Sequence, residues 1–156
     1  NVERKYLAAI AVGVIAIFLV GITGSIAALS SMLFPSGTLA EGVAKDSSVT
    51  SNILLRLRLL HPISAILTSV FIVFLTGWLA KETNNEQRVK RWSNVLSLLV
   101  LGQIAFGSLT LLTLAPILMQ LGHLFLADAI WISYVLLVAN FLSTEDRVVA
   151  NEGQPT

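Results

Sequence analysis

Four long apolar runs constrain the fold of this chain more than any other feature of its sequence. A helix needs about 20 mainly apolar residues to cross a bilayer. Four segments meet this requirement: residues 6–33, 53–79, 92–118 and 120–143. Only 12% of the 156 residues are charged, against about 25% in a typical soluble domain. The sequence therefore predicts an all-α integral membrane protein built as a four-helix transmembrane bundle.

The predicted domain covers residues 1–143, and residues 144–156 form a polar C-terminal tail that we expect to fray. Pro116 and Gly122 are expected to mark the turn between the third and fourth spans. The net charge of +1 gives no indication of nucleic-acid binding. Because the chain has no cysteine, disulfides and thiolate metal sites are excluded.

The distribution of Lys and Arg predicts the orientation, because cytoplasmic segments carry an excess of both. Seven of the ten flank the termini and the second-to-third loop, and three lie on the other side. We therefore expect both termini on the cytoplasmic or matrix side of a prokaryotic plasma membrane or mitochondrial inner membrane. The seven are Arg4, Lys5, Lys81, Arg88, Lys90, Arg91 and Arg147, and the three are Lys45, Arg56 and Arg58.

The chain has two histidines, and they occupy matching places. His61 lies eight residues into the second span and His123 a few residues into the fourth, which runs in the same direction. Each is followed four residues later, on the same helix face, by an alanine that leaves room for a flat group: Ala65 and Ala127. The preceding spans carry the small-residue stretches "GITGS" and "GQIAFGS". The pattern predicts two similar helical hairpins, each supplying one histidine.

Two imidazoles that face each other in an apolar bundle are typical of a six-coordinate haem. A structural zinc site would need four nitrogen or sulfur ligands, and two are present. The alternative interpretation is that each histidine only forms a hydrogen bond between helices.

Polar residues near the histidines add further expectations. Arg58 lies three residues before His61 and is well suited to pair with a haem propionate. Gln120 has the same spacing before His123 and is a candidate hydrogen-bond donor. Asp128 is the one acid inside a span, and we expect a hydrogen-bonded carboxyl there rather than a proton-transfer group. Pro62 is expected to kink its helix beside His61.

The stretches "RLRLLHPISA" and "QLGHLFLADAIW" resemble the haem A synthase family. The resemblance implies one of two similar four-helix halves in an enzyme that oxidises the C8 methyl of haem O to a formyl group. Catalytic halves typically carry Glu three residues before the first histidine and Arg after it, where this chain has Arg58 and Pro62. The resemblance therefore favours the C-terminal half, with His61 and His123 as axial ligands of a haem b and no catalytic residue.

The leading hypothesis is the haem b-binding, electron-transfer half of a haem A synthase-like oxidoreductase. One alternative is a stand-alone b-type cytochrome that takes electrons from quinol, and another is a cofactor-free assembly subunit. Whether the chain is an enzyme by itself stays open. The expected partners are the lipid bilayer, a second four-helix half or another copy of the chain, and cytochrome oxidase assembly factors or quinol.

Overall fold

The computed structural model describes residues 3–48, 50 and 52–152, with side chains described as far as residue 144. All regular structure in this part of the chain is helical, which confirms the predicted fold class. Four helices are long and apolar enough to cross a membrane. The helices are α1 (Arg4–Leu33), α2 (Leu39–Ser47), α3 (Ile53–Arg58), α4 (Leu60–Glu82), α5 (Gln87–Leu112) and α6 (Ile117–Glu152).

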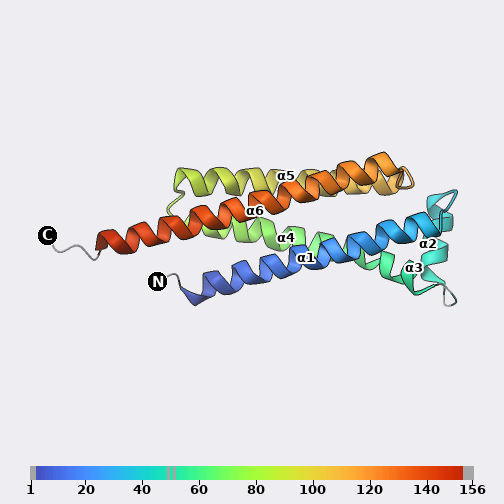
Figure 1. Ribbon diagram of the computed structural model, residues 1–156, viewed down its shortest axis with the longest axis horizontal. Helices are drawn as coiled ribbons and strands as arrows, with labels where there is room; N and C mark the ends of the chain where they lie inside the picture. Colours follow the sequence, from blue (N-terminus) through green and yellow to red (C-terminus); the bar gives the residue numbers. More distant parts are fainter. Residues whose placement is uncertain (1–2, 49, 51, 153–156) are drawn as a thin grey trace.

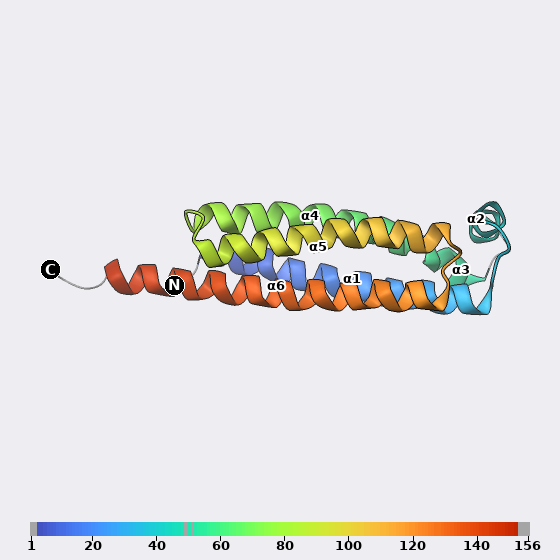
Figure 2. The ribbon, with the colours of Figure 1, turned by 90° about the horizontal axis from the view of Figure 1, so that it is seen from above.

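The four long helices lie side by side along the long axis of the molecule (Figure 1). The start of α1 and the end of α6 lie at one end, called here the terminal end. The short helices α2 and α3 lie at the other end, with the α5–α6 turn (Figures 1 and 2). Because α4 and α6 both begin there, we call it the histidine end. Contacts join α1 to α4, α4 to α5, α5 to α6 and α1 to α6, so α4 and α6 face each other diagonally.

The buried apolar core fills the terminal half of the bundle and draws on all four long helices. None of its fully buried members among the described residues falls between 11 and 71 or between 101 and 129. The ring of Tyr6 lies 5.0 Å from that of Trp78 and 5.4 Å from that of Phe141, measured between centroids. The histidine half of the bundle therefore lacks a comparable packed core. The members are Tyr6, Ile10, Ile72, Leu75, Leu79, Ala80, Val89, Leu96, Val100, Ile130, Tyr134, Leu137 and Phe141.

Large apolar side chains cover the outside of the long helices. Leu118 is 80% exposed and Phe125 is 73% exposed, and both lie on α6. Water would penalise so large an apolar surface, whereas lipid tails solvate it. The four apolar helices and this surface together make the chain an integral membrane protein.

The turn between α5 and α6 differs from the predicted one. α5 ends at Leu112 rather than near residue 118, and Leu114 and Ala115 adopt left-handed conformations with φ of 62° and 53°. The Ala115 N–H donates to the Thr110 carbonyl at 2.8 Å, which closes the helix end. Pro116 lies in this turn as expected, but Gly122 lies inside α6.

Gly122 serves close packing instead of a turn. A Cβ at this position would lie 2.9 Å from Phe106 Cζ on α5, closer than real Cβ contacts allow. The prediction that Gly122 marks the turn was therefore wrong. A glycine in the sequence can indicate either a turn or a close contact between two helices, and the sequence alone did not distinguish the two.

Two other expectations concern helix continuity. The segment with Arg58 and His61 is interrupted at Leu59, whose N–H bonds back to Arg56 O at 3.3 Å. Pro62 follows this interruption and has no N–H to donate to the Arg58 carbonyl four residues earlier, so it lies where the helix is broken beside His61. At the other end, α6 continues through Glu152, beyond the predicted end of the fourth span at residue 143. Residues 153–156 lie outside the described chain.

A close contact between α1 and α6 gives a testable prediction about stability. Tyr134 Oη donates to Ile10 O at 2.7 Å, and a Cβ on Gly13 would collide with that hydroxyl. Gly13→Ala is expected to lower the free energy of unfolding by about 1–3 kcal/mol through overpacking. Thermal unfolding in detergent measures this. Gly21→Ala on the same helix is the matched control, because nothing lies within 4 Å of its added Cβ.

A double variant tests whether the loss of stability comes from the clash between the new Cβ at position 13 and the Tyr134 hydroxyl. Tyr134→Phe removes the colliding oxygen, so it should recover part of the stability that Gly13→Ala loses. If Gly13→Ala unfolds at the same temperature as Gly21→Ala, the close α1–α6 approach is wrong.

Candidate functional site: a histidine pair across the bundle

His61 of α4 and His123 of α6 meet in the histidine half of the bundle. Their ring centroids are 6.2 Å apart and their planes are perpendicular, at 90°. Both side chains are half-buried. They come from the diagonal helices, so they approach each other across the bundle interior. The structure thus brings together two residues that are 62 positions apart in the chain, as their matched depth predicted.

Each histidine ring packs on a glycine of the preceding long helix. A Cβ on Gly24 of α1 would lie 3.0 Å from His61 Cε1, and a Cβ on Gly107 of α5 would lie 2.7 Å from His123 Cε1. Any side chain at either glycine would displace the ring. The two helical hairpins, α1 with α4 and α5 with α6, therefore hold their histidines in the same way.

Thr23 of α1 orients the ring of His61. Its Oγ1 lies 3.4 Å from His61 Nδ1 and donates its own hydrogen to the Val20 carbonyl at 3.0 Å. The same oxygen lies 3.2 Å from Ser64 Oγ. When Thr23 donates to the Val20 carbonyl, its oxygen can accept the Nδ1–H of the ring. This arrangement favours the tautomer whose Nε2 carries a free lone pair, as a metal ligand requires.

Gln103 of α5 plays a different part beside His123. Its Nε2 donates to the backbone carbonyl of His123 at 3.0 Å and lies 3.4 Å from the ring Nε2. Gln103 Oε1 and His123 Nδ1 are buried and have no hydrogen-bond partner within the described part of the chain. Phe106 stacks against the same ring, with centroids 6.4 Å apart and planes within 8°. The His123 side of the pair thus retains unused hydrogen-bonding capacity.

Arg58 is held by a carboxylate that the sequence analysis did not single out. Arg58 Nε donates to Asp46 Oδ2 at 3.0 Å, and Nη2 donates to Oδ1 of the same group. The side chains are 17% and 7% exposed, so the pair is largely shielded from water. Asp46 lies near the end of α2, which Thr38 caps through a bond from Glu41 N. The pairing of Arg58 with a haem propionate stays a prediction.

The remaining predicted site residues take varied positions. Ala65 and Ala127 are half-buried beside the histidines. Gln120 donates to Ala115 O at 2.6 Å and so stabilises the α5–α6 turn. Asp128 is exposed on α6 and makes no hydrogen bond with any described residue, so the expected bond to a neighbouring helix is wrong. Its position, five residues after His123, puts it about 140° around α6 from the histidine.

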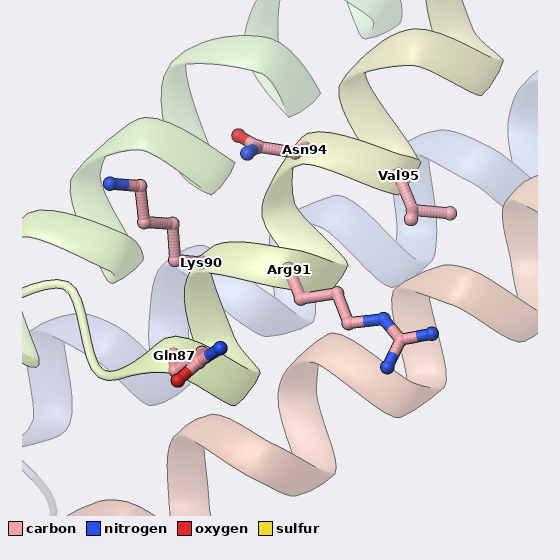
Figure 3. A pocket seen from close by; sticks show the side chains of 5 residues that line it. All are labelled: Gln87, Lys90, Arg91, Asn94 and Val95. Atoms are coloured by element: carbon pink, nitrogen blue, oxygen red, sulfur yellow. The ribbon is translucent and has the colours of Figure 1, made fainter.

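An open hollow on α5 lies away from the histidines, near the terminal end. Gln87, Lys90, Arg91, Asn94 and Val95 line it. Lys90 and Arg91 extend to opposite sides of the helix and do not converge on one point (Figure 3). This hollow therefore offers no focused binding position for an anion, and the histidine pair is the better candidate site.

Comparison with known families gives a match over most of the chain. The model of the COX15-CtaA family, described as cytochrome oxidase assembly proteins, matches residues 1–135. The chain belongs to this family. The resemblance to haem A synthases noted in the sequence is thereby confirmed at the level of the family.

Two curated relatives carry a different name. Both are called protoheme IX farnesyltransferase, and they come from two strains of Thermus thermophilus. Each is 32% identical over 146 residues, which is 93% of this chain and 24% of the relative. The chain therefore spans about a quarter of the length of these relatives. No solved structure matches the chain.

Proposed function

We propose that this COX15-CtaA family chain binds a haem b between His61 and His123. It would serve as the electron-transfer half of a haem A synthase-like membrane oxidoreductase. The observation that carries the proposal is the 6.2 Å separation of the two ring centroids. A metal–imidazole bond is about 2 Å long, and the ring centre lies about 1 Å beyond the nitrogen. Two imidazoles on opposite sides of one iron therefore have centres about 6 Å apart.

The ligand set also fits a haem better than a bare metal ion. No group of three or more His, Asp or Glu side chains that could hold an ion occurs among the described residues. An iron inside a porphyrin brings its equatorial ligands with it and needs only two axial ligands from the protein. His123 Nδ1 is buried and has no hydrogen-bond partner among the described residues. This ring can therefore still form a bond to a group that is not part of the chain.

The uneven packing of the bundle supports the same proposal. The fully buried apolar core stops short of the histidines, although the helices continue past them. Protein interiors normally pack as densely as organic crystals along their whole length. A large flat apolar group beside Ala65 and Ala127 would supply the missing contacts. The hypothesis of a cofactor-free assembly subunit does not explain why the buried apolar core ends before the histidines.

When bound, a haem b would supply one-electron transfer. His61 and His123 would hold the haem iron, and the protein would use the bound group to relay electrons. Thr23 would keep the Nδ1 proton of His61 in place and leave Nε2 to face the metal. Oxidation of a methyl group would need another centre, in a second four-helix half or another copy of the chain.

The family assignment favours this proposal over a stand-alone b-type cytochrome, because the family is described as cytochrome oxidase assembly proteins. The curated relatives are named protoheme IX farnesyltransferase, and a name that refers to a haem supports a haem-related role for this chain. We propose quinol or an assembly factor as the redox partner. We also propose that both termini face the cytoplasm or matrix, since the terminal end carries most of the basic residues.

A spectrum of the purified protein tests the proposal. After expression with ample haem supply, the detergent-solubilised chain should show the sharp α-band of a low-spin b haem in a reduced-minus-oxidised difference spectrum. A pyridine haemochrome assay should identify the group as haem b. A correctly folded, helical chain that contains no haem would refute both the proposal and the b-type cytochrome alternative.

A further inference from the structure

The ion pair between Asp46 and Arg58 connects the short helix α2 to the bundle near the histidines. Arg58 is the last residue of α3, and His61 follows three residues later, past the interruption at Leu59. Asp46 reaches the guanidinium from a different element and is 12 residues away in sequence. Gly42 of α2 also approaches the pair, since a Cβ there would lie 3.7 Å from Arg58 Nη2. The pair thus fixes both the position of α2 and the conformation of Arg58.

The pairing uses only part of the hydrogen-bonding capacity of the guanidinium. Arginine carries five N–H donors in a rigid planar fork. The Nε–H and one N–H on Nη2 go to the two oxygens of Asp46. The N–H groups on Nη1 make no bond with another described residue. A guanidinium held along one edge by a carboxylate can therefore still bind a second carboxylate along the other edge.

We infer that Asp46 is a positioning residue of the haem site, which holds Arg58 so that its free edge binds a propionate of the bound haem. This inference rests on the proposed function. It makes α2, which lies outside the four spans, part of the cofactor site. Asp46 itself does not touch the haem, and it acts through the conformation of Arg58.

Two roles of Asp46 predict opposite changes in the midpoint potential of the haem: a positioning role for Arg58, and a role that only attaches α2 to the bundle. If Asp46 were only a nearby negative charge, its removal would make the site more positive and raise the midpoint potential of the haem. If Asp46 positions Arg58, its removal lets the long side chain leave the propionate. The propionate charge is then uncompensated, which favours the ferric state and lowers the midpoint potential.

The test is a redox titration of the haem-loaded chain followed by its visible spectrum. Asp46→Asn is expected to lower the midpoint potential, in the same direction as Arg58→Leu, with haem content retained. Arg58→Lys keeps the positive charge but loses the fork, and it should also lower the potential. Glu41→Gln is the matched control: Glu41 is an exposed acid of the same helix and pairs with Lys45 at 2.7 Å. It should leave the potential unchanged or raise it slightly.

A charge-swapped variant separates the tether from the haem contact. Asp46→Arg combined with Arg58→Asp restores an ion pair between α2 and α3, so protection of α2 from protease should recover. The potential should stay low, because position 58 then presents a carboxylate to the propionate.

A raised or unchanged potential in Asp46→Asn would overturn the inference and leave the proposed function standing. Absence of haem from the wild-type chain would overturn both. If Asp46→Asn does not fold, Asp46→Glu is measured instead: it keeps the negative charge but moves the carboxylate, so a lowered potential supports the positioning role and an unchanged potential overturns it.

Discussion

Replacing His61 or His123 with alanine is expected to abolish the low-spin haem b spectrum. Each substitution would remove one of the two proposed iron ligands, so the low-spin state should be lost even where some haem stays bound. Loss of an outer-sphere partner already costs about 10–100-fold in metal affinity, so loss of a ligand should lower haem content by at least ~10-fold. Difference spectra and haem-to-protein ratios of the purified variants measure both effects.

Asp128→Asn is the matched control for the histidine variants. Asp128 lies on the same helix as His123, is exposed and has no hydrogen-bond partner among the described residues. Its substitution should leave the spectrum unchanged. If both alanine variants retain the low-spin signal at wild-type haem content, the histidines are not the ligands and the proposed site is wrong.

Gly107→Ala is expected to reduce haem binding sharply, although it adds a single methyl group. The new Cβ would lie 2.7 Å from His123 Cε1, a separation at which the ring must move. A displaced ring no longer presents its nitrogen at the distance an iron requires, so we expect a loss of about 10-fold or more, similar to that from misplaced ligands. Haem titration followed by absorbance measures the affinity.

Substitutions at three glycines should reduce haem affinity to different extents. Gly24→Ala should reduce haem affinity less, because its Cβ would lie 3.0 Å from His61 Cε1. Gly102→Ala, on the same helix as Gly107, should have no effect, since nothing lies within 4 Å of its added Cβ. Equal affinities for the Gly107 and Gly102 variants would show that the His123 ring does not rest on α5.

The sequence predicted the architecture well because the constraints involved are local. A bilayer requires long apolar helices, so segment length and composition identified the four spans. The matching places of His61 and His123 followed from counting residues along parallel spans. Their approach to 6.2 Å agrees with that count, because the helical rise is nearly constant.

Helix ends were harder to predict, because several residue patterns compete there. Gly122 was read as a turn residue, but α6 uses it to approach Phe106 closely. The chain reverses instead at Leu114 and Ala115, two residues that rarely adopt left-handed conformations. No composition rule favours that choice, and it depends on how α5 and α6 pack.

The residues around the histidines show what only the tertiary structure decided. By itself, the sequence determined the membrane helices, their pairing into hairpins and the depth of the two histidines, since each depends on spacing along one helix. Only the folded chain placed Thr23 and Gln103 beside the rings and Asp46 against Arg58. Those contacts join different helices, so they depend on helix rotation and on the path of the loop carrying α2. A single sequence does not encode either quantity in a local pattern.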